Sequence, residues 1–139
     1  MGLSCVIAVP GTYLTMERGT LPMLLVRSDD GVARAVVNMY RHRGAPVANV
    51  YGRTTGFTCR YHGWSHGRAG DLKIIPDQRN FPCVELQDHG LIPLPLGERQ
   101  GMIWVKLDSA AEINLDQHLS SMADELEGYD LQNYVHYQN

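Results

Sequence analysis

The sequence predicts an all-β fold of short antiparallel strands, closed by one C-terminal helix. Short apolar runs recur through the first three quarters of the chain, and turn-forming residues separate them. The clearest run is Met-Leu-Leu-Val at 23–26, which Asp29-Asp30-Gly31, a strong hairpin signal, follows shortly afterwards. Helical periodicity is confined to the C-terminal part. With 139 residues, the chain is long enough for one domain with its own core.

The expected strands follow from these local patterns in chain order. Each is a short apolar or β-branched run that ends at Gly, Pro, Asp or Asn. The segment 76–90 is rich in polar residues and turn formers, which predicts an ordered loop with one short helical turn. The strands are expected at 6–9, 13–16, 23–26, 32–39, 50–52, 56–59, 72–75, 91–96 and 102–107.

One amphipathic helix is expected over about 115–127. Asn114 is a suitable N-cap, and Gln117 stands three residues later as a capping-box partner. Gly128 lies just past the expected end. The apolar residues of this segment fall on one helical face, and His118 lies off that face; they are Leu115, Leu119, Met122 and Leu126.

The most informative stretch is 38–64. It contains His42, sixteen intervening residues, and then Cys59 and His62 in the spacing Cys-x-x-His. Arg43-Gly44 follows the first histidine, and Gly63-Trp64 follows the second. This pattern resembles the two cluster-binding loops of Rieske iron–sulfur domains, which read Cys-x-His and Cys-x-x-His. Three of the four ligand positions match, and Tyr40 stands where the first cysteine belongs.

The resemblance implies an antiparallel β-sandwich base that carries a small cluster-binding subdomain. The Rieske-like domain would cover 1–128, with cluster-binding loops at 40–46 and 59–66. The tail 129–139 lies where the oxygenases of this family continue into a catalytic domain. A Rieske centre is a [2Fe–2S] cluster with two thiolates on one iron and two imidazoles on the other. On this template the metal ligands are His42, Cys59 and His62, with Tyr40 in the fourth position; the cofactor-lining residues are Arg43, Gly44, Gly63 and Trp64.

Tyr40 leaves three outcomes open at the metal centre. A phenol carries its oxygen at the far end of a ring and normally keeps its proton, with an ordinary pKa near ~10. The chain then holds an altered [2Fe–2S] cluster, or an empty site, or a single Zn or Fe ion on His42, Cys59 and His62. Cys5 and Cys83 are too remote in sequence to replace the missing thiolate.

The resemblance is to the oxygenase-type branch of the family. Respiratory Rieske proteins carry an extra cysteine in each loop, where this chain has Ala45 and Tyr61. The run Gly-Met-Ile-Trp-Val-Lys-Leu-Asp at 101–108 is similar to the last strand of the Rieske domain in ring-hydroxylating oxygenase large subunits. The resemblance therefore implies an electron-transfer domain, which receives electrons from a reductase or ferredoxin and passes them to a catalytic oxygenase domain.

A second hypothesis is a degenerate Rieske fold without a cluster, acting as an interaction module or a nonfunctional fragment. The sequence contains no two-histidine, one-carboxylate motif for a mononuclear iron, so we expect no catalytic centre in this chain. Phe81 and Cys83 are expected to pack under the cluster subdomain. His66 and His89 have no partner spacing and are expected at the surface.

Composition and charge limit the location and the partners. Three scattered cysteines, no leader-like N-terminus and no long apolar run predict a cytoplasmic protein without a membrane segment. The net charge of −3 combines five arginines and no acid within 41–68 with seven acids and no Lys or Arg after 107. The basic stretch is either an incidental solvated surface or a rim that steers an acidic electron-transfer partner. Nucleic-acid binding is not expected, because the basic patch is small.

Overall fold

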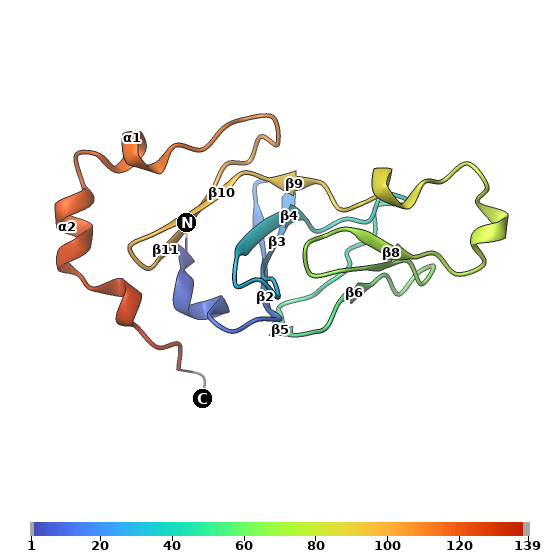
Figure 1. Ribbon diagram of the computed structural model, residues 1–139, viewed down its shortest axis with the longest axis horizontal. Coiled ribbons are helices and arrows are strands. Elements are labelled where there is room, and N and C mark those ends of the chain that lie inside the picture. Colours follow the sequence, from blue (N-terminus) through green and yellow to red (C-terminus); the bar gives the residue numbers. More distant parts are fainter. Residues whose placement is uncertain (1, 138–139) are drawn as a thin grey trace.

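The computed structural model describes residues 2–137 and confirms the predicted all-β class. The molecule is elongated, with the C-terminal helical segment at one end and the segment around residues 76–86 at the other (Figure 1). Between these ends lie three antiparallel sheets. Within residues 2–137, none of the helices combines the length and the apolar character that crossing a membrane would require.

The central sheet has five strands and buries both of its faces. In β3 the side chains of Met23 and Leu25 belong to one apolar cluster, and those of Leu24 and Val26 belong to the other. Because successive side chains of a strand point to opposite faces, this continuous apolar run serves two cores at once. In spatial order the strands are β5 (Tyr51–Arg53), β2 (Thr12–Arg18), β3 (Leu21–Arg27), β4 (Ala33–Val37) and β9 (Pro93–Leu94).

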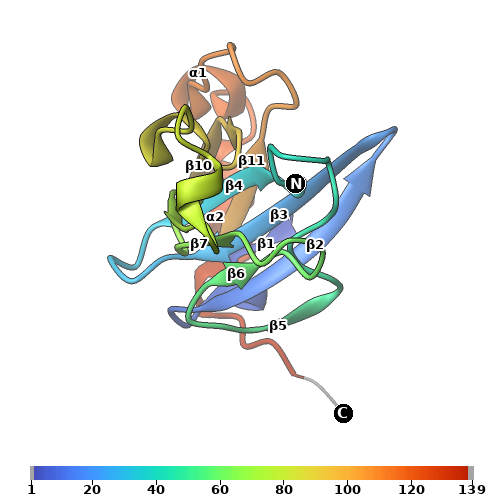
Figure 2. The ribbon, with the colours of Figure 1, turned by 90° about the vertical axis from the view of Figure 1, so that its right-hand side faces the viewer.

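Two smaller sheets flank the central one (Figure 2). The first packs Ile103 and its neighbours against Met23 and Leu25, and the second contributes Phe57 and Leu72 to the other core. The first contains β1 (Gly2–Leu3), β11 (Met102–Val105) and β10 (Leu96–Arg99). The second contains β6 (Phe57–Thr58), β7 (Ser65–His66) and β8 (Leu72–Ile74).

Some elements differ from the sequence-based expectation. The segment 6–9, predicted as a strand, begins in the 3-10 helix η1 (Ser4–Ile7) and ends in a bend. This turn buries Ile7, whose carbonyl oxygen accepts a hydrogen bond of 2.9 Å from Arg27 Nε. The short strands β1, β7 and β10 were not predicted separately. The segment 76–90 contains two helical turns instead of one, η2 (Gln78–Asn80) and η3 (Leu86–Asp88).

The C-terminal segment is helical as predicted, but a turn divides it into α1 (Leu115–Leu119) and α2 (Ala123–Gly128). The Asn114 cap is confirmed, since its side-chain oxygen accepts a hydrogen bond of 3.1 Å from the backbone N–H of Gln117. Beyond α2 lies the turn η4 (Leu131–Asn133). The break at Ser120–Met122 leaves Met122 45% exposed, so it does not share the apolar face expected for it.

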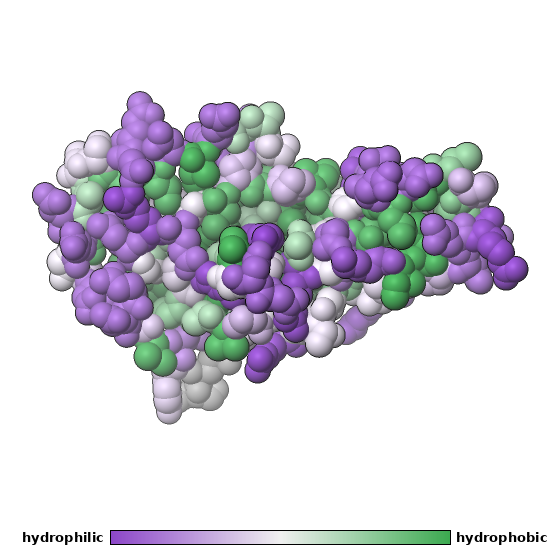
Figure 3. Space-filling view, in the orientation of Figure 1, coloured by the Kyte–Doolittle hydropathy of each residue, from purple (hydrophilic) through white to green (hydrophobic). Residues whose placement is uncertain are grey.

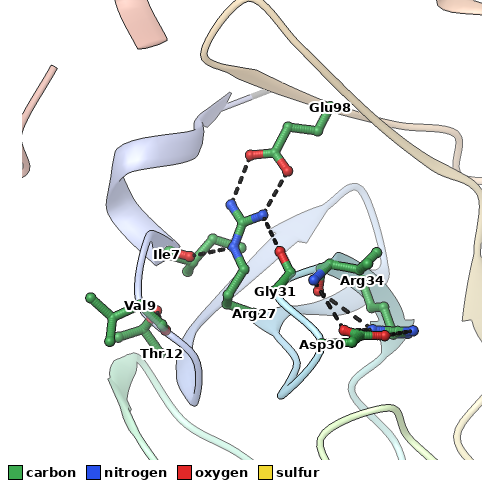
Figure 4. A network of polar contacts seen from close by, with 9 residues as sticks. Ile7, Val9, Thr12, Arg27, Asp30, Gly31, Arg34 and Glu98 are labelled. Carbon is green, nitrogen blue, oxygen red and sulfur yellow. Dashed lines mark hydrogen bonds and ion pairs between the residues drawn. The ribbon is translucent and has the colours of Figure 1, made fainter. Parts of the chain in front are cut away.

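A buried arginine joins β3 to neighbouring segments (Figure 4). Arg27 forms a two-pronged ion pair with Glu98 of β10, with N···O distances of 2.6 and 2.7 Å. Its remaining donors reach the carbonyl oxygens of Ile7 and Gly31. The polar contacts of this guanidinium each link β3 to another segment, so Arg27 holds these segments together.

Candidate functional site

The two predicted loops have the same backbone construction. In each, the first ligand position donates its N–H to the carbonyl five residues later and accepts an N–H from the glycine four residues later. The distances lie between 2.9 and 3.1 Å, and the residues are Tyr40, Gly44 and Ala45 in the first loop and Cys59, Gly63 and Trp64 in the second. Tyr40 therefore occupies in its loop the position that Cys59 occupies in the other.

The two loop glycines are required by the backbone. Gly44 and Gly63 have φ values of +71° and +73°, a region that side chains with a Cβ rarely adopt. A Cβ on Gly63 would lie 2.9 Å from Cγ of Pro76, so this position also lacks space. The first loop is further held by buried Asn38, which bonds the backbone of Val47 and Ala48. The sequence analysis assigned no role to Asn38; the available signal was a polar residue near the end of the expected strand 32–39.

The side chains of both loops meet at one point. The rings of His42 and His62 lie 4.6 Å apart, and the Tyr40 ring stands edge-on to His42 at 5.8 Å. The Tyr40 hydroxyl is 2.5 Å from Nδ1 of His62. Cys59 is 1% exposed, and its sulfur accepts a bond of 3.4 Å from the Tyr61 amide. The structure therefore brings His42, His62 and Tyr40 together, and Cys59 lies in the same buried cluster as Tyr40.

Aromatic residues form one wall of this site. Trp64 stacks on His42 with ring centroids 5.1 Å apart and an interplanar angle of 13°. Phe81 contacts both rings edge-on at 5.7 Å, which agrees with the expectation that it packs beneath the loops. Cys83 was expected there as well, but it is exposed. Arg43, predicted to line the cofactor, is also exposed.

Burial shifts the protonation of the site toward neutral forms. It raises the pKa of Tyr40, and the neighbouring Cys59 raises it further. Burial lowers the pKa of His42, and the nearby His62 and Arg43 lower it further. A protonated phenol and a neutral imidazole result. Nδ1 of His42 is inaccessible to solvent and has no hydrogen-bond partner among the described residues.

His66 is buried, whereas the sequence predicted it at the surface. It is 2% exposed, because its pairing in β7 opposite Phe57 and Leu72 turns the ring inward. Burial lowers its pKa. The backbone of His89 and Phe57 lies near the ring, yet within residues 2–137 neither ring nitrogen meets the geometry of a hydrogen bond.

Comparison with known proteins identifies the family. Residues 4–87 match the Rieske [2Fe-2S] domain. The chain belongs to this family. It is 33% identical over 121 residues to the chlorobenzene dioxygenase subunit alpha of Cupriavidus sp. (strain PS12), covering 86% of this chain and 27% of the relative. It is 31% identical over 134 residues to the glycine betaine monooxygenase oxygenase subunit of Chromohalobacter salexigens, covering 96% and 30%.

Solved structures agree with this Rieske assignment. Naphthalene 1,2-dioxygenase from Rhodococcus sp., bound to indole, superimposes with a TM-score of 0.83 at 27% identity, covering 91% of this chain and 29% of that one. A quaternary ammonium Rieske monooxygenase has a TM-score of 0.85 at 22% identity, over 92% and 35%, which supports the fold alone. The Rieske domain of this chain thus spans under a third of the length of the two curated relatives.

The family implies a [2Fe–2S] cluster, and the sequence carries the residue types of its ligands at three of the four expected positions. The orphaned Nδ1 of His42 and the two imidazoles facing each other suit an iron held by nitrogen ligands. The fourth position does not fit, because the Tyr40 phenol is protonated and engaged with His62. Within residues 2–137, no three His, Cys, Asp or Glu side chains are arranged to hold a metal ion.

Proposed function

We propose that this chain is the electron-transfer domain of a ring-hydroxylating-oxygenase-like protein, with His42, Cys59 and His62 as its retained ligands. The observation that carries the proposal is the pair of equivalent loops, which place the imidazoles of His42 and His62 with centroids 4.6 Å apart and keep Cys59 buried in the second loop. A Rieske cluster, when bound, supplies a one-electron carrier with a potential raised by its imidazole ligands. Binding it here requires Tyr40 to leave His62.

The surroundings of the loops support such a role. Arg43 and Arg60 are exposed beside the ligand residues, and Arg41 bonds the Asp88 carbonyl at 2.7 Å. A positive rim favours an extra electron at the centre and attracts an acidic redox partner. The proposed partners are a reductase or ferredoxin as donor and a catalytic oxygenase domain as acceptor.

A second candidate is a Rieske fold that carries no cluster and serves as an interaction module. The Tyr40–His62 contact favours it, because one nitrogen of the predicted ligand His62 already has a hydrogen-bond partner. A single Zn or Fe ion on His42, Cys59 and His62 would meet the same obstacle at His62.

Metal and sulfide analysis of protein purified without oxygen separates these candidates. The electron-transfer proposal predicts iron, acid-labile sulfide and a visible chromophore that a reductant bleaches. Cys59→Ser should abolish all three, whereas Cys83→Ser, which removes an exposed cysteine, should retain them. Colourless wild-type protein with neither iron nor sulfide, and with a melting temperature unaffected by chelators, would support the second candidate instead.

A further inference from the structure

The side chain of Tyr40, which stands where a cysteine is expected, bridges the two loops. It starts in the first loop, at the position equivalent to Cys59, and its hydroxyl ends on His62 in the second, 2.5 Å from Nδ1. A cysteine at the same position would stop one atom beyond Cβ. The aromatic ring therefore lies in the space between the loops, where a cluster would need to be.

The ring is fixed in that space by packing on several sides. Tyr40 is 0% exposed, and it stands edge-on to His42 at 5.8 Å and to Trp64 at 6.1 Å. The His62 ring lies tilted beside it, with centroids 6.3 Å apart. Both predicted histidine ligands thus contact the phenol ring, and one of them bonds its oxygen.

We propose that Tyr40 is a stopper that closes the Rieske site in the metal-free protein, so that the closed state and metal ligation exclude each other. Closure and ligation compete for Nδ1 of His62 and for the same volume. The closed state then substitutes one hydrogen bond and aromatic packing for the iron that would otherwise join the loops. The inference refines the proposed function, on which its metal-loading part rests; its metal-free part does not depend on that function.

Two variants separate the hydroxyl from the ring. Tyr40→Phe keeps the ring but removes the bond to His62, and Tyr40→Cys removes both and supplies a thiol. Tyr61→Phe is the matched control, because Tyr61 also lies against His62, at 4.0 Å between centroids, but is 61% exposed. In chelator, Tyr40→Phe should lower the melting temperature by about 3–6 °C, as expected for loss of one buried hydrogen bond. Tyr61→Phe should change it by less than about 1 °C.

The same proteins are then reconstituted anaerobically with iron and sulfide, and the metal per chain is counted. The stopper predicts the highest loading for Tyr40→Cys, less for Tyr40→Phe, and the least for wild type and Tyr61→Phe. An unchanged melting temperature in Tyr40→Phe would overturn the stopper. Wild-type loading equal to that of Tyr40→Cys would also overturn it, while leaving the electron-transfer proposal intact. If even Tyr40→Cys takes up no iron while Tyr40→Phe has a lower melting temperature than wild type, the role of Tyr40 in closing the site is supported and the electron-transfer proposal fails.

Discussion

Replacing His66 by phenylalanine is expected to stabilise the domain, and to do so more strongly as the pH falls. The ring is 2% exposed, and among the described residues the backbone of His89 and Phe57 lies near it without the geometry of a hydrogen bond, so its polar atoms are buried with little compensation. Leaving a buried polar group unpaired costs roughly 1–3 kcal/mol. A phenyl ring of similar shape removes that cost, and the flanking Phe57 and Leu72 are apolar.

The pH dependence follows from burial, which lowers the pKa of His66 in the folded state; the backbone of His89 and of Phe57, and then Asp71, oppose this shift. The unfolded chain takes up a proton near the ordinary pKa of about 6.5, and the folded chain does so only at lower pH. Stability from the neutral ring is therefore present above that pH and is lost as the pH falls below it. For one proton withheld from the folded state, the loss between pH 7 and pH 5 is at most about 2 kcal/mol.

Urea denaturation of wild type, His66→Phe and His66→Gln at pH 7, 6 and 5, all in chelator, measures both effects. The difference between His66→Phe and wild type should grow as the pH falls. Burial also lowers the pKa of His42, but this contribution is common to all three proteins and cancels in the differences. His66→Gln keeps a polar group but cannot titrate, so it should lose the pH dependence without the full gain. A difference that stays constant from pH 7 to pH 5 would refute the reasoning.

Three other changes test the framework. Glu98→Gln should lower the free energy of unfolding by about 1 kcal/mol at pH 7, after allowing for its partly exposed side chain. Because the Arg27 hydrogen bonds lower the pKa of Glu98, this loss should vanish at pH values below the ordinary carboxyl range. Equal losses at pH 7 and pH 3 in urea titrations would contradict this. Val50→Gly should stabilise the fold by about 1 kcal/mol, since a 74% exposed valine at φ +58° is strained, and a lower melting temperature would argue against strain. Gly101→Ala should lower the free energy of unfolding by about 1–3 kcal/mol, because its Cβ would lie 2.3 Å from the Leu131 carbonyl carbon. The C-terminal segment should then become accessible to protease. An unaffected digestion pattern would show that the contact is dispensable.

The features that the sequence predicted correctly are those encoded locally. The apolar run of β3, the Asp-Asp-Gly turn and the Asn114 cap each depend on neighbouring residues, and the structure confirms them. The two glycine-flanked loops belong to the same class, because Gly44 and Gly63 occupy backbone conformations that favour glycine wherever they occur.

The features that escaped prediction depend on partners distant in the chain. The inward turn of His66 is fixed by pairing between strands of two or three residues, too short to show a pattern. The contact from Tyr40 to His62 joins positions twenty-two residues apart and needs the three-dimensional meeting of both loops. The break between α1 and α2 occurs at Ser120–Met122, where the periodic pattern of apolar residues continued. Local sequence therefore identified the candidate ligands, but not the state of the site they form.

The convergence of the two loops is tested most directly by an iron-edge anomalous map from crystals of the Tyr40→Cys protein reconstituted without oxygen. We expect iron density enclosed by His42, Cys59, His62 and the substituted position. Iron bound at another place, or a well-folded crystal structure in which these side chains point to separate regions, would contradict it.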